Sequence, residues 1–156
     1  MGEIIEFSSN GSSAQGYLAI PESGHGRGVI VIQEWWGVNP HICGVVDRLA
    51  VAGFVALAPD HYRGAVTTEP DEAGKLMLGL HIATVAKDLA GAAAALVSLP
   101  SVDGDEVGFG GLSHCGRNRL GPRITRRNAN CGDWFLDSGA FALFAGKNQM
   151  RARDSA

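Results

Sequence analysis

The fold of this chain is decided by the stretch Asp105-Glu106-Val107-Gly108-Phe109-Gly110-Gly111-Leu112-Ser113-His114-Cys115-Gly116. A short run of strand character ends in glycines and then presents a hydroxyl and a thiol two residues apart. The segment from Gly111 to Cys115 nearly spells G-x-S-x-G, the strand-to-helix turn that raises a nucleophile above the edge of a sheet. Such a nucleophile has a strained backbone, so the residues two before and two after it must be small. Gly111 meets this requirement, whereas Cys115 meets it poorly because it carries a side chain.

The preceding chain predicts a β-α-β unit. Residues 28–33 and 54–58 are continuous apolar runs, which are typical of strands buried on both faces of a parallel sheet. Between them, Asn39 and Pro40 open a helix whose apolar residues recur at helical spacing, and Gly53 ends it. Parallel neighbours joined by a crossover end at the same edge of the sheet, where the functional loops of α/β proteins lie.

The rest of the chain up to residue 112 extends this alternation. The further elements expected are β segments at 3–8 and 14–20 around an Asn-Gly turn, a helical region from Pro70 to before Pro100 that breaks near Gly79, and a strand at 106–110. A turn at Asp103-Gly104-Asp105 is expected to lead into that last strand. The predicted class is α/β, with a mostly parallel sheet flanked by helices and a C-terminal part that is missing or irregular.

Composition excludes several classes of protein. With 156 residues, 46% hydrophobic and 19% charged, the chain has the length and apolar content for one folded core. No run approaches the roughly 18 apolar residues of a membrane span, and the N-terminus lacks the pattern of a signal peptide. Three cysteines, an odd and sparse set, predict reduced thiols in a cytoplasmic protein. No Cys/His spacing resembles a zinc site, and no metal or cofactor is expected.

The net charge of −3 hides an asymmetry between two regions. Residues 1–111 carry 5 basic and 13 acidic side chains, whereas residues 112–156 carry 8 basic and 3 acidic ones. In the second region, arginines and the pair Gly121-Pro122 stand where a small apolar helix should follow the turn. The arginines lack interleaved aromatic residues, so they do not indicate a nucleic-acid site. We expect a folded core at 1–116 and an irregular basic tail at 117–156.

Two segments resemble the dienelactone hydrolase family. They are Val29-Ile30-Val31-Ile32-Gln33-Glu34-Trp35-Trp36-Gly37-Val38-Asn39 and Leu49-Ala50-Val51-Ala52-Gly53-Phe54-Val55-Ala56-Leu57-Ala58-Pro59-Asp60-His61-Tyr62. The resemblance covers roughly residues 14–116. It implies an α/β-hydrolase-like fold and the hydrolysis of a small carboxylic ester or lactone through an acyl-enzyme, with no nucleic-acid or membrane partner. The oligomeric state stays open.

The resemblance also implies roles for five residues. Ser113 matches the nucleophile, and Glu34 matches the glutamate that contacts the resting nucleophile. The backbone N–H groups of Trp35 and His114 fall where the oxyanion hole is expected. Cys115 replaces a glycine of the motif, and its thiol is either an alternative nucleophile or an inert, half-buried group.

The downstream Asp and His of the family have no counterpart here. His114 is the only histidine after Ser113, and an adjacent residue cannot easily turn back to deprotonate its neighbour. The chain also ends before the last strands and helices of that fold. We therefore expect the residues after about 112 to be out of frame or strongly diverged, and hydrolysis to be impaired. The alternative is a non-catalytic remnant or a small-molecule-binding domain of the same fold.

Other polar and aromatic residues leave two interpretations open. Trp35 and Trp36 form the walls of an apolar substrate pocket or pack under the edge of the sheet. His61 and Arg63 bind a substrate carboxylate or keep a strand-end loop soluble. His25 is expected to be a surface residue with no chemical role.

Overall fold

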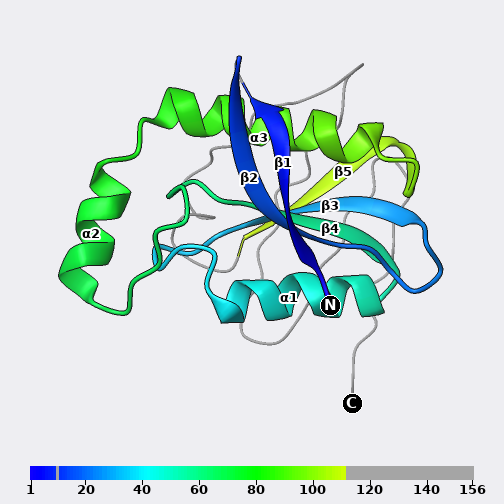
Figure 1. Cartoon of the computed structure of the whole chain (residues 1–156), viewed down its shortest axis with the longest axis horizontal. Helices are drawn as coiled ribbons and strands as arrows, with labels where there is room; N and C mark the ends of the chain where they lie inside the picture. The colour runs from blue at the N-terminus through cyan, green and yellow to red at the C-terminus, as the bar shows by residue number, and fades with distance from the viewer. Residues whose placement is uncertain (10, 112–156) are drawn as a thin grey trace, which may run out of the picture.

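A computed structural model describes residues 1–9 and 11–111 of the chain (Figure 1). Its elements in chain order are β1 (Glu3–Ser9), β2 (Ser12–Ala19), β3 (Gly26–Ile32), α1 (Pro40–Val51), β4 (Phe54–Pro59), α2 (Pro70–Leu78), α3 (Ile82–Ser98) and β5 (Val102–Gly111). The predicted elbow residues Ser113, His114 and Cys115 lie outside the described residues, as does the predicted tail at 117–156. Those predictions stay predictions.

The described strands form one mixed sheet in the order β1-β2-β4-β3-β5. Strand β3 is parallel to both β4 and β5, while β2 is antiparallel to β1 and β4. The expectation of three parallel neighbours is confirmed, with β3 in the middle. The α/β class is confirmed too, as a mixed sheet with helices on both faces.

The register brings the ends of the parallel strands to one edge. Ile30 of β3 lies opposite Leu57 of β4 on one side and Phe109 of β5 on the other. Ile32 lies opposite Gly111, so β3 and β5 end level with each other. We call this end of β3, β4 and β5 the carboxyl edge, and the opposite end the amino edge.

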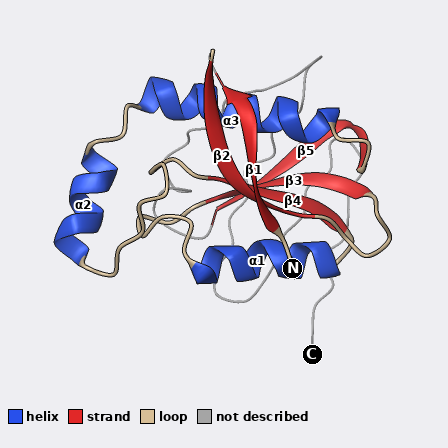
Figure 2. Ribbon diagram, viewed as in Figure 1, coloured by secondary structure: helices blue, strands red, loops and turns tan. Residues whose placement is uncertain are grey.

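Both faces of the sheet are covered, by α1 on one side and α3 on the other (Figure 2). Neighbouring side chains of β3 alternate between the two: Ile30 belongs to the core under α3, and Val29 and Val31 to the core under α1. This alternation explains the continuous apolar run of β3. Helix α3 approaches β1 closely at Gly91, where a Cβ atom would lie 2.7 Å from the Ser8 carbonyl oxygen. Helix α2 stands beside the carboxyl edge (Figure 1).

The bounds of one strand differ slightly from the expectation, and one expected turn was wrong. The central strand runs from Gly26 to Ile32, so Gln33 lies just beyond it. The predicted turn at Asp103-Gly104-Asp105 is instead an irregularity inside β5: Gly26 pairs with Val102 and Gly28 with Val107, with a register shift between the two pairs. Gly104, at φ 87°, supplies the left-handed backbone of this bulge.

The helical expectations held. Helix α1 begins at Pro40 after Asn39, and the region from Pro70 is broken between Leu78 and Ile82. Within the described part of the chain, no single helix is long and apolar enough to cross a membrane. Helices α2 and α3 reach that length and composition only as a pair bent by 86°.

Candidate active site

The chain makes a tight turn at residues 34–37, directly after β3. The Gly37 N–H donates to the Glu34 carbonyl oxygen at 3.2 Å, and the Asn39 N–H donates to the Gly37 carbonyl at 2.9 Å. Gly37 has φ 90°, a conformation that favours glycine. The Asn39 side-chain oxygen then accepts the Ile42 N–H at 3.0 Å and caps α1. The helix thus fixes the far end of the turn that carries Glu34.

The two indoles of this turn contact each other. The ring centroids of Trp35 and Trp36 lie 4.7 Å apart with their planes inclined by 60°, a favourable tilted arrangement of aromatic rings. Both side chains are half-buried. The pair therefore combines packing with exposed aromatic surface at the carboxyl edge.

A second loop, residues 60–67, leaves the carboxyl edge after β4. The Asp60 carboxylate accepts the N–H of Tyr62 at 2.9 Å and also the N–H of Gly64. Between them, Arg63 has φ 54°, in the left-handed region that non-glycine residues seldom adopt. Such a backbone conformation costs on the order of 1 kcal/mol and needs support from its surroundings. The Asp60 carboxylate supplies that support by binding the backbone N–H groups on both sides of Arg63.

His61 of the same loop is buried, at 9% exposure. Its two ring nitrogens have no hydrogen-bond partner among the described residues. Burial lowers the pKa of His61, and the nearby carboxylates of Asp88 and Asp60 oppose this effect. Both interpretations of His61, as a carboxylate-binding and as a solubilising residue, are therefore wrong, because its ring nitrogens are buried.

The structure places two of the five predicted site residues. Glu34 and Trp35 follow Ile32 at the carboxyl edge, and Gly111 lies beside Ile32 at the end of β5. Ser113, His114 and Cys115 come next in the sequence, outside the described residues. Strand β5 therefore ends at the same edge of the sheet as Glu34. A nucleophile elbow directly after β5 requires this arrangement.

Sequence reasoning assigned no role to Gln33. Its side chain is buried, at 4% exposure, and its Oε1 accepts the His61 N–H at 2.9 Å. The available signal was an amide directly after a continuous apolar strand, where the side chain has to find a partner in a neighbouring strand or loop.

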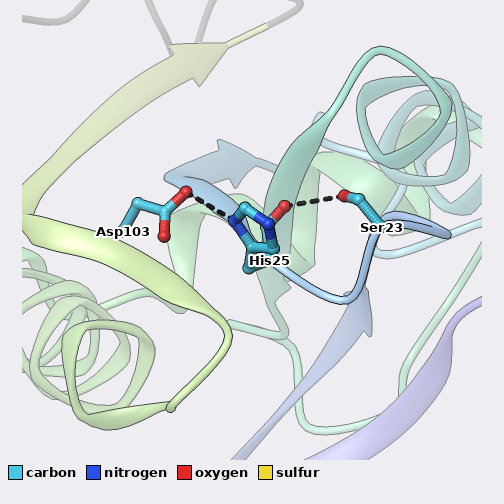
Figure 3. A network of polar contacts seen from close by, with 3 residues as sticks. All are labelled: Ser23, His25 and Asp103. Carbon is cyan, nitrogen blue, oxygen red and sulfur yellow. Dashed lines mark hydrogen bonds and ion pairs between the residues drawn. The ribbon is translucent and has the colours of Figure 1, made fainter.

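His25 lies at the opposite, amino edge and pairs with Asp103 (Figure 3). The distance from Nδ1 to the carboxylate is 3.0 Å, and the two side chains are 64% and 56% exposed. The Ser23 hydroxyl donates to the His25 carbonyl oxygen at 2.9 Å. This surface contact is remote from the strand ends that carry Glu34. Within the described residues, no three Asp, Glu, His or Cys side chains are grouped so as to hold a metal ion.

The sequence matches the profile of the Dienelactone hydrolase family over residues 14–118. Two curated relatives are "Protein usf" of Aquifex pyrophilus, 51% identical over 80 residues, and "Carboxymethylenebutenolidase" of a Pseudomonas species, 48% identical over 46 residues. The first alignment covers 49% of this chain and the second 30%. The chain spans only 34% and 19% of the lengths of these two relatives.

A solved structure shares the fold. It is a dienelactone hydrolase-like promiscuous phosphotriesterase from metagenomic libraries, with a TM-score of 0.62 and 27% identity. The alignment covers 72% of this chain and 48% of that one. The likeness therefore extends over most of the described residues and about half of the solved protein.

Proposed function

Because this chain belongs to the dienelactone hydrolase family, we propose that it hydrolyses carboxylic esters or lactones at the carboxyl edge, with Ser113 as nucleophile. The register of β3 and β5 is the observation that carries this proposal. Ile32 lies opposite Gly111, and in the sequence Glu34 and Ser113 each follow two residues later. The names of the relatives support an ester or lactone as substrate.

In the proposed reaction, the Ser113 oxygen attacks the carbonyl carbon of the substrate. The carbonyl oxygen becomes an oxyanion, which accepts hydrogen bonds from the backbone N–H groups of Trp35 and His114. The bond to the alcohol oxygen then breaks, the alcohol leaves with the serine proton, and the acyl group stays on Ser113. Water attacks the acyl group and releases the acid. Glu34 contacts the Ser113 hydroxyl in the resting state.

The loops suggest how the substrate is held. Arg63 is an exposed residue of the loop that leaves the carboxyl edge after β4, and a guanidinium binds a carboxylate with two parallel hydrogen bonds. Trp35 and Trp36 supply aromatic surface for an apolar or conjugated part of the substrate. A substrate with a free carboxylate and a flat lactone or aryl ring fits this combination best.

We expect slow turnover by the 156-residue chain, because His114 is the one histidine among its residues 114–156. A serine without its base keeps a high pKa and is a poor nucleophile. An oxyanion hole and binding alone leave a rate enhancement of about 10³–10⁴ over water in serine hydrolases that have lost triad members. The second candidate is therefore a small-molecule-binding domain, which the half-buried pair of indoles also favours.

The test is hydrolysis of an activated aryl ester by the purified chain. We expect weak, saturable activity that Ser113→Ala reduces and Cys115→Ala leaves nearly unchanged. The reverse result would make the Cys115 thiol the nucleophile. Absence of hydrolysis, together with quenching of tryptophan fluorescence by an aryl carboxylate, would support the binding domain instead. Brisk turnover that is lost in His114→Ala would show that His114 acts as the base.

A further inference from the structure

We propose that Gln33 is a positioning residue that joins the turn at residues 34–37 to the loop at residues 60–67, so that both move as one unit. The inference rests on the proposed function for its purpose, because residues 34 and 35 are the described members of the proposed site. The contact itself is independent of any activity.

The first link is the side chain of Gln33. It lies directly after the central strand, and its Oε1 accepts the backbone N–H of His61 at 2.9 Å. Both residues are buried. A buried N–H that loses its partner is costly, since water does not replace it. Gln33 therefore fixes the start of the turn relative to the start of the loop.

The second and third links join the far end of the turn to the far end of the loop. The Thr67 N–H donates to the Trp36 carbonyl oxygen at 3.2 Å. Gly37 packs so tightly that a Cβ atom there would lie 2.4 Å from the Ala65 carbonyl oxygen. The turn is thus held against the loop at both of its ends, and Glu34 lies between these contacts.

The loop is in turn anchored to α2. The Thr67 hydroxyl donates to the Glu72 carboxylate at 2.7 Å and accepts the Glu69 N–H at 3.1 Å. A displacement of the turn would therefore be transmitted through Thr67 to the first residues of α2. The strand register does not depend on these contacts, because the ladders between β3, β4 and β5 set it separately.

The experiment compares Gln33→Met with Gln15→Met. Methionine keeps the length of glutamine but removes the acceptor. Gln15 is the matched control, since it is exposed and its side-chain amide donates to Glu6 at the surface. Amide hydrogen exchange is measured for the full chain. In Gln33→Met we expect about tenfold faster exchange at His61 and Thr67, and unchanged exchange at core positions of β3 and β4.

Two further variants keep the inference falsifiable. Gln33→Glu returns an acceptor oxygen and should restore most of the protection at His61. Gln33→Asn keeps the amide but is one methylene shorter, so it should show the pattern of Gln33→Met at smaller amplitude, even if Gln33→Met does not fold. Uniformly faster exchange through the core in Gln33→Asn would overturn the inference, because Gln33 would then support global stability only. Unchanged exchange at His61 and Thr67 would overturn it as well.

A second readout follows the turn directly. The coupled circular dichroism signal of the Trp35–Trp36 pair should weaken in Gln33→Met and stay intact in Gln15→Met. If the chain hydrolyses esters, kcat should fall more than KM rises, since the displaced groups act on the transition state. Local loosening without any hydrolysis in the unmodified chain would refute the proposed function and leave the inference standing.

Discussion

Each edge of the sheet carries a histidine beside a strand end, and the two histidines have opposite surroundings. At the amino edge, His25 is exposed and pairs with the exposed Asp103. At the carboxyl edge, His61 is buried without a ring partner among the described residues, while its backbone N–H is bound by Gln33. The side-chain contact of His25 at the amino edge is thus exposed to water, whereas the Gln33 side chain at the carboxyl edge is buried and binds a backbone N–H. A buried bond to the backbone, such as the one from Gln33 to His61, fixes the geometry of a loop. The carboxyl edge, where we propose the active site, needs such a fixed loop.

Of the changes at the two edges, removal of the Asp60 carboxylate at the carboxyl edge should have the largest effect on stability. Asp60→Ala leaves the N–H groups of Tyr62 and Gly64 without their charged acceptor and withdraws support from Arg63. We expect a loss of about 2 kcal/mol in the free energy of unfolding. Urea denaturation measures it, with Asp103→Ala at the other edge as the control. Equal effects of the two variants would contradict the contrast.

Acidification should lower the free energy of unfolding through His61, and so reveal the difference between the two edges. Its pKa in the folded chain is lowered from 6.5 by burial, against the opposing charges of Asp88 and Asp60. Asp88 is itself engaged by the Ser9 hydroxyl. The unfolded chain therefore binds a proton at a higher pH than the folded one does. Protonation of His61 in the unfolded chain therefore lowers the free energy of unfolding. This loss of stability is absent well above pH 6.5 and grows as the pH falls from that value toward the folded pKa.

We expect His61 to change the free energy of unfolding by at most about 1.4 kcal/mol per pH unit. Urea denaturation at several pH values measures it, and His61→Phe should remove the dependence between pH 7 and the folded pKa. The control is His25→Phe, which should leave the dependence in place. A dependence that survives in His61→Phe would have to come from other groups.

The smallest effect is expected for the contact between His25 and Asp103 at the amino edge. Both partners are more than half exposed, and exposed pairs contribute little because water and salt screen them. Asp103→Asn should change the free energy of unfolding by less than about 0.5 kcal/mol. A change above about 1 kcal/mol would mean that the pair secures the bulge of β5.

Most of the fold could be predicted because its signals are local. The alternation of Val29, Ile30 and Val31 between two cores is already visible as an apolar run. Asn39 and Pro40 indicate the start of α1, because helix capping is a local interaction that needs no tertiary contact. The expected turn at Gly104 is a bulge in the structure, because a glycine between two aspartates has the same local preference in a turn and in a bulge.

The arrangement around His61 could not be predicted in this way. Its burial depends on the adjacency of β3 and β4 and on the approach of α3, which brings Asp88 near the ring. The bond from Gln33 to His61 joins residues 28 positions apart, and no local pattern marks such a pair. Glu34 and Trp35 were assigned through family resemblance, and the structure adds their common edge with β5.

The strand order has a consequence for how the chain folds. Strands β1 and β2 are joined by a short turn and pair in full register, so they close a small loop early. Strand β3 pairs with β4 after a connection that contains one helix. On its other side, the pairing of Gly28 with Val107 closes a loop of about 80 residues. Closing a loop of this length costs more conformational entropy, so this pairing is expected to form slowly. On the ribosome, β3 is therefore expected to remain open on that side until β5 emerges. The part of the chain that completes the carboxyl edge is thus the last described part to be made, and its pairing should limit the rate of folding.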